Sequence, residues 1–264
     1  MATLTDAFRV VRGRVVAAAK HIVKPWVPSQ RARYRLSQAY LQGEGIEIGA
    51  LHNPLRTSRR ARVRYVDRLP RSELLRHYPE MIGTGVVDPD IIDDGEKLLT
   101  LANGSLDFII ANNFIEHCEN PIRTLQNFFL RLREGGIVYL AVPDKRYTFD
   151  RQRLSTPFEH LEQDHRDDGV ATRHAHFADF ARYSHFRDRA SAADVQQLAQ
   201  SWLEQNYSIH FHVWNFDEFS AFLKQLKASY LPGLQVAECL RNGNENIYIL
   251  RKTGDQAGVA AAPS

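Results

Sequence analysis

The residues best suited to chemistry are two acids at the ends of short apolar runs. Glu47 lies in the run Ile46–Ile48, and Asp67 follows the run Val63–Val66 twenty positions later. An acid after a second strand can accept hydrogen bonds from ribose hydroxyls, while Gly49 lets the first turn approach a ligand. The further glycines of a dinucleotide site are missing, so the stretch favours a nucleoside ligand without a pyrophosphate. The alternatives are an N-cap role for Asp67 and a structural carboxylate, bonded to loop amides, for Glu47.

Two further stretches could complete such a site. Asp94 and Gly95 follow a weak third strand, where an acid can accept from an adenine amino group; the adjacent Asp93 could take the same role. Asn112 follows the apolar run Leu106–Ala111, whose composition indicates a strand buried on both faces. Strand tips of an open parallel sheet face one crevice, so we expect four of these side chains to converge on one ligand: Glu47, Asp67, Asp94 and Asn112.

The elements that position these residues alternate between strand and helix. We predict strands at 46–48, 63–66, 86–88, 106–111 and 137–142, helices at 72–78, 122–133 and 215–230, and a final strand pair at 234–240 and 246–250. This pattern predicts an α/β fold with a Rossmann-like, mostly parallel, seven-stranded sheet and an antiparallel C-terminal edge hairpin. Residues 144–213 break the rhythm and predict a helical, His-rich insertion that serves as a substrate lid.

Composition limits the classes of protein that remain. The chain has 264 residues, 44% of them hydrophobic and 25% charged, which fits one decorated globular domain over 41–252, with a small polar tail, 253–264, expected to be disordered. Two cysteines indicate a reducing compartment, and we expect a cytoplasmic protein. Residues 1–40 hold eight cationic and one anionic residue, so the remainder of a chain with net charge +3 is acidic. An acidic body argues against nucleic acid as a partner.

The basic N-terminal arm, residues 1–40, contains an amphipathic pattern. Its apolar residues recur at helical spacing: Phe8, Val11, Val15, Ala19, Ile22 and Trp26. One interpretation is peripheral contact with the inner face of an anionic membrane through residues 1–28. The alternatives are an Arg-rich presequence and a helix packed on its own domain or on a partner.

Histidines and cations gather after the fourth and fifth strands. A general base is needed if the acceptor is a hydroxyl, and the main candidates are His117, His160 and His165, with Asp164, His210 and His212 as further ones. Lys145 and Arg146 follow the fifth strand at the crevice mouth and could bind an anionic group of an acceptor, with His212 as a further contact. Neither His174-Ala-His176 nor His210-Phe-His212 has a matching partner set in the sequence, so we predict no metal site.

The motifs together resemble the class I S-adenosylmethionine-dependent methyltransferases over about residues 45–142. Ile46-Glu-Ile-Gly49 is similar to the family's first motif, Tyr65-Val-Asp67 to its ribose-binding acid, and Asp94-Gly95-Glu96 to its adenine-reading stretch. Asp107–His117 and Leu132-Arg-Glu-Gly-Gly136 resemble its fourth-strand motif and the approach to its fifth strand. The resemblance implies S-adenosylmethionine as cofactor, bound by Glu47, Gly49, Asp67, Asp94, Gly95 and Asn112. One departure is that Ala50, Leu51, His52 and Asn53 stand where the family usually has glycines.

A narrower resemblance involves Glu47–Pro54, Tyr65–Leu69, Val142–Asp150 and His210–Trp214. These look like a bacterial methyltransferase group associated with glycosyltransferases and surface-polysaccharide loci. The resemblance implies O-methylation of a sugar or glycan-linked acceptor, a role in polysaccharide biosynthesis and a glycosyltransferase as partner. The alternatives are a methyltransferase acting on a small metabolite or lipid, and a degenerate, non-enzymatic scaffold for a glycosyltransferase.

Overall fold

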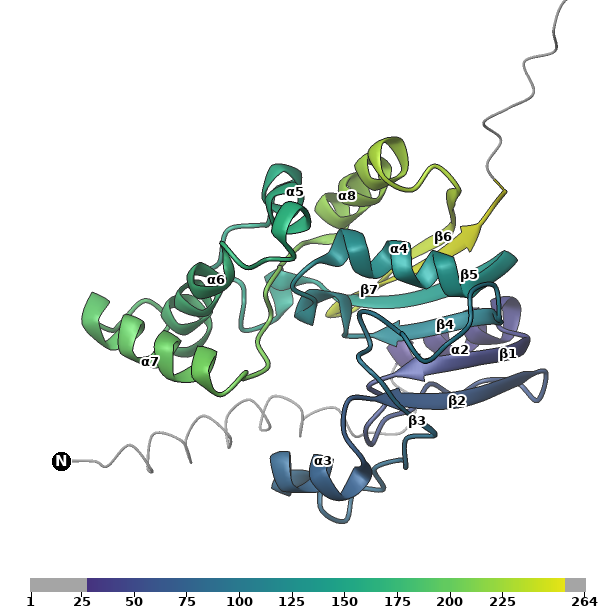
Figure 1. Ribbon diagram of the computed structural model, residues 1–264, viewed down its shortest axis with the longest axis horizontal. Coiled ribbons are helices and arrows are strands. Elements are labelled where there is room, and N and C mark those ends of the chain that lie inside the picture. The colour runs from purple at the N-terminus through teal and green to yellow at the C-terminus, as the bar shows by residue number, and fades with distance from the viewer. Residues whose placement is uncertain (1–27, 255–264) are drawn as a thin grey trace, which may run out of the picture.

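The computed structural model describes residues 28–254. The amphipathic helix predicted within the N-terminal arm lies outside these residues, as does the tail beyond residue 254. Within the described range the chain forms one sheet covered by helices, with a helical insertion at one end (Figure 1).

The described residues build a seven-stranded sheet in the order β3-β2-β1-β4-β5-β7-β6. The strands are β1 (Gly43–Ile48), β2 (Ala61–Asp67), β3 (Ile91–Ile92), β4 (Leu106–Asn112), β5 (Leu132–Pro143), β6 (Leu234–Asn242) and β7 (Glu245–Lys252). Strands β1 to β5 pair in parallel, and β7 runs antiparallel to both β5 and β6. This confirms the predicted Rossmann-like sheet with an antiparallel C-terminal edge.

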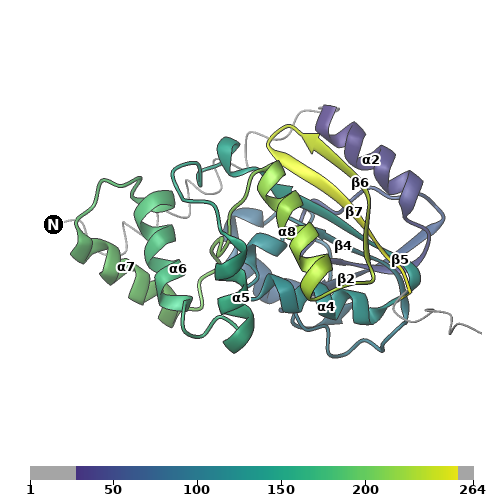
Figure 2. The same cartoon turned by 90° about the horizontal axis from the view of Figure 1, so that it is seen from above.

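Helices cover both faces of the sheet. The helices are α2 (Pro28–Tyr40), α3 (Arg71–His77), α4 (Pro121–Arg131), α5 (Phe158–Asp167), α6 (Arg173–Asp179), α7 (Ala192–Glu204) and α8 (Phe216–Ser229). Figure 2 shows α4 and α8 on one face and α2 on the other. Shorter turns are η1 (Pro79–Met81), η2 (Ile115–His117), η3 (Lys145–Tyr147) and a π-helical turn, η4 (Phe180–His185).

Local sequence explains where the covering helices begin. Asn120 caps α4 by accepting the N–H of Arg123 at 2.9 Å, and Pro121 occupies the first helical position, where no N–H is needed. Asn215 and Glu218 form a reciprocal capping box at the start of α8. Both signals are readable in the sequence, and both helices begin where they were predicted.

Each face of the sheet has its own core. Successive residues of a strand point to opposite faces, so Phe108 joins Leu36 of α2 on one side while Ile109 joins Phe128 of α4 and Phe222 of α8 on the other. This two-sided burial explains why β4 reads as a continuous apolar run.

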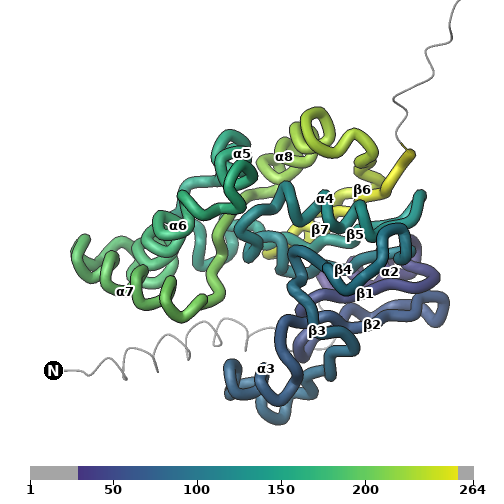
Figure 3. The backbone as a smooth tube through the Cα atoms, viewed as in Figure 1, coloured from purple at the N-terminus to yellow at the C-terminus, as the bar shows by residue number. Residues whose placement is uncertain are grey.

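The insertion between β5 and α8 has a third core. Phe177, Phe180, Trp202 and Phe211 form its buried centre. Its helices α5, α6 and α7 lie beyond the carboxyl ends of the parallel strands (Figure 1), and the backbone trace leaves the sheet after β5 and returns to it through α8 (Figure 3). The insertion therefore stands over the edge at which a Rossmann-like sheet binds its ligand.

Two sequence-based expectations were wrong in position or incomplete. The third strand was expected at 86–88 but lies at Ile91–Ile92, because Val87 N–H bonds instead to Leu51 O, while Asp90 accepts the N–H of Tyr65 and fixes where pairing with β2 starts. Helix α2 was not predicted. No helix of the described part of the chain is long and apolar enough to cross a membrane.

Candidate cofactor and catalytic site

The carboxyl ends of β1, β2 and β4 meet at one edge of the sheet. Glu47 of β1 pairs in register with Tyr65 of β2 and Ile110 of β4. Asp67 and Asn112 are the last residues of β2 and β4. The topology therefore places three of the predicted cofactor-binding residues on adjacent strand ends.

Glu47 holds the loop that follows β1. Its side chain is buried, and both carboxylate oxygens accept the N–H of Leu55, at 2.9 and 3.0 Å. Burial raises the pKa of Glu47 to about 7, against the opposing effect of the Leu55 hydrogen bond. This geometry is that of a carboxylate bonded to loop amides, so a direct contact between Glu47 and a ligand stays a prediction.

Gly49 and Asn112 each offer a ligand one feature: free space beside the backbone and an unpaired acceptor atom, respectively. Gly49 has φ +61°, and a Cβ added there would have no atom within 4 Å, so open space lies beside its backbone. Asn112 Nδ2 lies 3.5 Å from Glu47 Oε1, while its buried Oδ1 has no hydrogen-bond partner. An unpaired buried acceptor such as Asn112 Oδ1 suits an amino or ammonium donor.

The loop after Gly49 has larger residues where the resembled family usually has glycines, but the side chains of Leu51 and His52 are not buried in the site. Leu51 takes a left-handed conformation with φ +49° and is partly exposed, and His52 is exposed. The site thus has room next to Gly49, although larger side chains flank it.

Asp67 stands at the carboxyl end of β2. One of its carboxylate oxygens accepts the N–H of Arg68 at 2.7 Å. Partial burial raises its pKa. A carboxylate with remaining lone pairs at this strand end can accept hydrogen bonds from a diol.

The acids after β3 divide their roles. Asp93 accepts both the N–H and the hydroxyl of Thr100, at 2.8 and 2.7 Å, and so holds its own loop together. Asp94 is half-exposed and pairs with Lys97 at 3.0 Å. Asp94 is therefore the acid that remains accessible at this edge.

Gly95 allows close packing at the same edge. A Cβ at Gly95 would lie 2.6 Å from Ile48 Cγ2 and 2.8 Å from Phe114 Cζ. No side chain fits there without displacing its neighbours, so Gly95 brings its backbone against the ends of β1 and β4.

Behind these strand ends lies a buried acid beside an imidazole. Both carboxylate oxygens of Glu116 are buried without a hydrogen-bond partner, and burial raises its pKa to about 7. The adjacent His117 has Nδ1 2.8 Å from the carbonyl oxygen of Ile209. Burial, together with the nearby His210, lowers the pKa of His117 to about 3, so its imidazole is neutral. If Nδ1–H donates to that carbonyl, Nε2 is left as an acceptor.

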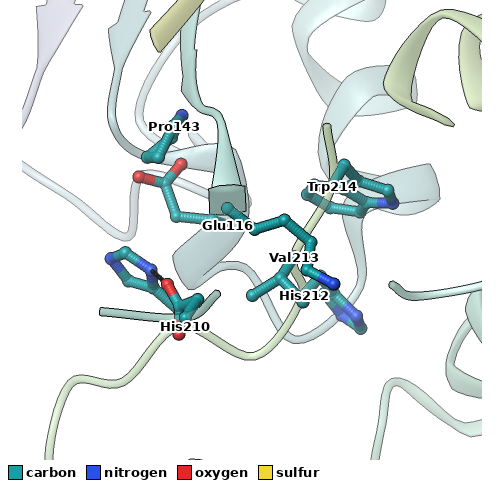
Figure 4. Close-up of a pocket in the computed structure, with 8 residues that line it drawn as sticks. Glu116, Pro143, His210, His212, Val213 and Trp214 are labelled. Carbon is teal, nitrogen blue, oxygen red and sulfur yellow. Dashed lines mark hydrogen bonds and ion pairs between the residues drawn. The ribbon is translucent and has the colours of Figure 1, made fainter. Parts of the chain in front are cut away.

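His210, one of the further candidate bases, is paired with Asp150, a partner that the sequence did not indicate. Nδ1 of His210 lies 2.7 Å from Asp150 Oδ2. Although burial alone would raise it, the bond to His210 and the charge of Arg153 hold the pKa of Asp150 well below its usual value. The imidazoles of His117 and His210 meet edge to face with centroids 4.6 Å apart. Figure 4 shows Glu116 and His210 in the pocket that Pro143 and Trp214 also line.

Lys145 and Arg146 follow β5 as predicted, and both have partners within the chain. The ammonium of Lys145 bonds to the carbonyl of Arg153 and lies 3.3 Å from Ser155 Oγ. Arg146 forms a two-pronged pair with Asp144, at 2.8 and 2.7 Å. Arg146 keeps a half-exposed side chain, whereas Lys145 is anchored.

The insertion histidines lie apart from His117. His165 Nδ1 lies 3.2 Å from Asn120 Oδ1 on the α4 side. His160 and His212 face each other across a different buried cluster. Figure 4 shows the side chains of His210 and His212 on opposite sides of the extended segment that carries them. The structure thus assembles Glu116, His117 and His210 at the strand ends and separates His160, His165 and His212 from them.

Comparison with known proteins defines the class. A family model described as a methyltransferase domain matches residues 38–226, and the chain belongs to this methyltransferase family. The match covers strands β1 to β5, the insertion and most of α8. No curated protein matches the chain.

Solved structures share the fold at low identity. A Rhodobacter sphaeroides protein named as a zinc-dependent alcohol dehydrogenase has a TM-score of 0.50 at 16% identity, over 87% of this chain and 91% of that one. A SAM-dependent methyltransferase of Thermotoga maritima has a TM-score of 0.44 at 14% identity, over 91% and 97%. The 1,6-didemethyltoxoflavin-N1-methyltransferase of Burkholderia thailandensis, solved with S-adenosylhomocysteine, has a TM-score of 0.46 at 12% identity, over 96% and 92%. These likenesses concern the fold alone.

Proposed function

We propose that this chain transfers a methyl group from S-adenosylmethionine to a hydroxyl group of a sugar or glycan-linked acceptor. The observation that carries the proposal is the Asp150–His210 pair, held at 2.7 Å beside the carboxyl ends of β4 and β5. A histidine whose ring is oriented by a buried carboxylate can act as a general base, and such a base is needed when the acceptor atom must lose a proton.

The cofactor-binding residues lie along the sheet edge. Asp67 would accept the ribose hydroxyls, and Asp94 would accept from the adenine amino group. Asn112 Oδ1 and the space beside Gly49 would receive the methionine portion. The cofactor would supply a methyl group bonded to a sulfonium sulfur, from which a neutral thioether leaves readily.

The protein therefore mainly positions the acceptor and receives its proton. With Nδ1–H donated to Asp150, Nε2 of His210 would take the hydroxyl proton as the oxygen bonds to the methyl carbon. The methyl–sulfur bond would break in the same step, and the cofactor would leave as the neutral thioether S-adenosylhomocysteine. Asp150 then stabilises the resulting imidazolium, as a buried carboxylate does for a histidine base. The buried Glu116 adds negative charge beside the same ring when it is ionised.

The sugar class of the acceptor rests on the resemblance of four sequence segments to methyltransferases of surface-polysaccharide loci. Arg146, half-exposed after β5, suits contact with an anionic or hydroxyl-rich acceptor. A glycosyltransferase as partner is a further proposal of the same origin.

Calorimetry with S-adenosylhomocysteine tests the cofactor. We expect binding that Asp67→Ala weakens by at least about tenfold, since each lost charge-assisted hydrogen bond costs about 1.5–3 kcal/mol. The exposed Asp88→Ala is the matched control and should bind like the wild type. No binding to the folded protein at high micromolar ligand would overturn the proposal.

Transfer of a labelled methyl group tests the acceptor. Glycan fractions, small metabolites and lipids are offered separately, and the methylated product is identified by mass spectrometry. Methyl ethers on a sugar support the proposal. A methylated nitrogen or carbon would overturn the hydroxyl acceptor while leaving the methyltransferase class intact.

A further inference from the structure

A second buried cluster lies on the other side of the segment that carries His210. It consists of His160 and Asp164 on α5, His176 on α6, and His212 on the extended segment before α8. His160 and Asp164 are one helical turn apart, so both project from the same side of α5. His176 and His212 come from elements that are distant in sequence, so their spacing along the chain does not reveal the set.

One ligand atom from each of the four side chains lies within 4.8 Å of the other three. Asp164 Oδ2 lies 3.4 Å from Nε2 of His160, 3.4 Å from Nε2 of His176 and 3.6 Å from Nε2 of His212. Nε2 of His160 and Nε2 of His176 are 3.1 Å apart. Four ligands placed tetrahedrally at about 2.0–2.1 Å from a zinc ion are separated by about 3.3–3.4 Å. The four separations given above, from 3.1 to 3.6 Å, agree with such a set.

Without an ion this arrangement leaves polar atoms unsatisfied. Asp164 Oδ2 makes no hydrogen bond, and neither does Nε2 of His212, although both residues are fully buried. Nε2 of His160 and Nε2 of His176 can share one hydrogen bond, but that bond leaves Asp164 Oδ2 and Nε2 of His212 without a partner. A buried polar atom left unpaired is costly, because it has given up its hydrogen bonds to water. One divalent cation at the centre would satisfy all four atoms together.

The surroundings orient the ligands as metal sites require. Thr172 Oγ1 donates to Asp164 Oδ1, which turns the other carboxylate oxygen toward the centre. The ring of Trp214 stacks on His212, and Phe211 packs against His176. Three imidazoles and one carboxylate, all of them buried except the partly exposed His160, match the ligand preference of zinc.

We propose that His160, Asp164, His176 and His212 bind a structural zinc ion that ties the insertion to the segment carrying the catalytic histidine. Four protein ligands leave no open position, which is the arrangement of a structural rather than a catalytic zinc. The ion links α5 and α6 to residues 210–214, where the N–H groups of Phe211 and His212 also bond to the carbonyl of Glu116. The proposal is independent of methyl transfer.

Metal analysis of the full-length protein, purified without chelator or nickel resin, tests the site. We expect about one zinc per chain by mass spectrometry of the metal. His176→Ala and Asp164→Asn should each lower the content about tenfold. The control is His174→Ala, because His174 lies on the same helix but is exposed, and it should keep the ion.

The wild type provides a test that does not depend on the folding of variants. Removal of zinc by a strong chelator should lower the thermal unfolding temperature and speed proteolysis within residues 144–213, and added zinc should reverse both. Cobalt in place of zinc should give the absorption of a tetrahedral site. A folded wild type with less than about 0.1 zinc per chain after dialysis against zinc would overturn the proposal. A zinc ion that is lost in His117→Ala but kept in Asp164→Asn would also overturn the proposal. Such an ion would be bound by Glu116, His117 and His210 instead.

Discussion

Nδ1 of His210 lies 2.7 Å from Oδ2 of Asp150, a residue 60 positions earlier in the chain. This pair joins the two arms of the insertion, one following β5 and the other preceding α8. It places an oriented imidazole beside Glu116 and His117, next to the strand ends where the cofactor is expected.

The first prediction concerns Asp150. Asp150→Asn should lower kcat for methyl transfer by about 10²–10⁴-fold, because an amide cannot stabilise the imidazolium of His210. His210→Gln, which keeps the Asp150–Arg153 pair, should give a similar loss with an intact fold. The exposed Asp188→Asn serves as control. Full activity of Asp150→Asn would exclude His210 as a base that depends on this carboxylate.

The second prediction concerns the buried carboxyl of Glu47. Its pKa is raised from the usual 4.5 to about 7 by burial, so folding takes up a proton between these values. The stability it contributes is present below the unfolded pKa and is lost as the pH rises through about 7. Between pH 5 and 8 the free energy of unfolding of the wild type should therefore fall relative to Glu47→Gln, by up to about 3 kcal/mol.

Urea unfolding at four pH values measures this difference. The exposed Glu44→Gln, in the same strand, is the control and should run parallel to the wild type. A difference between wild type and Glu47→Gln that does not change with pH would contradict the prediction.

The third prediction concerns Gly95. Gly95→Ala should destabilise the protein by about 1–3 kcal/mol, because its Cβ would press on Ile48 and Phe114. It should also weaken binding of S-adenosylhomocysteine, since those neighbours lie at the ends of β1 and β4. Gly254→Ala, where the new Cβ meets its neighbour at 3.6 Å, is the control. Thermal melting and calorimetry give the two readings; unchanged values in both would contradict the close packing.

The fourth prediction concerns Arg146 at the crevice mouth. Arg146→Gln should raise KM for the acceptor several-fold with little change in kcat, because Arg146 would contact the acceptor equally in the ground and transition states. The nearby, exposed Arg151→Gln is the control. An unchanged KM would contradict a contact between Arg146 and the acceptor, and the role of Arg146 would then be limited to its ion pair with Asp144.

The sheet was predictable because its signals are local. The run containing Phe108 and Ile109 reports burial on both faces of β4, and Asn215 with Glu218 marks the start of α8. β3 was misplaced because only two residues pair there, and the side chain of Asp90, not an apolar pattern, sets their position.

The same distinction applies to the site. Adjacent parallel strands bring Glu47, Asp67 and Asn112 together, and topology alone predicts this. The partners of His210 and His212 come from α5, α6 and the segment after β5, which only the tertiary fold places side by side. The spacing of these residues along the chain does not indicate that their side chains are in contact.

The insertion begins and ends at neighbouring backbone positions. Asp144 and Trp214 form a parallel bridge, and the N–H of Lys145 bonds to the carbonyl of Trp214 at 2.9 Å. The intervening residues can therefore change in length or shape without altering any strand of the sheet. Residues 145–213 thus form a closed loop that starts and finishes at one point of the fold.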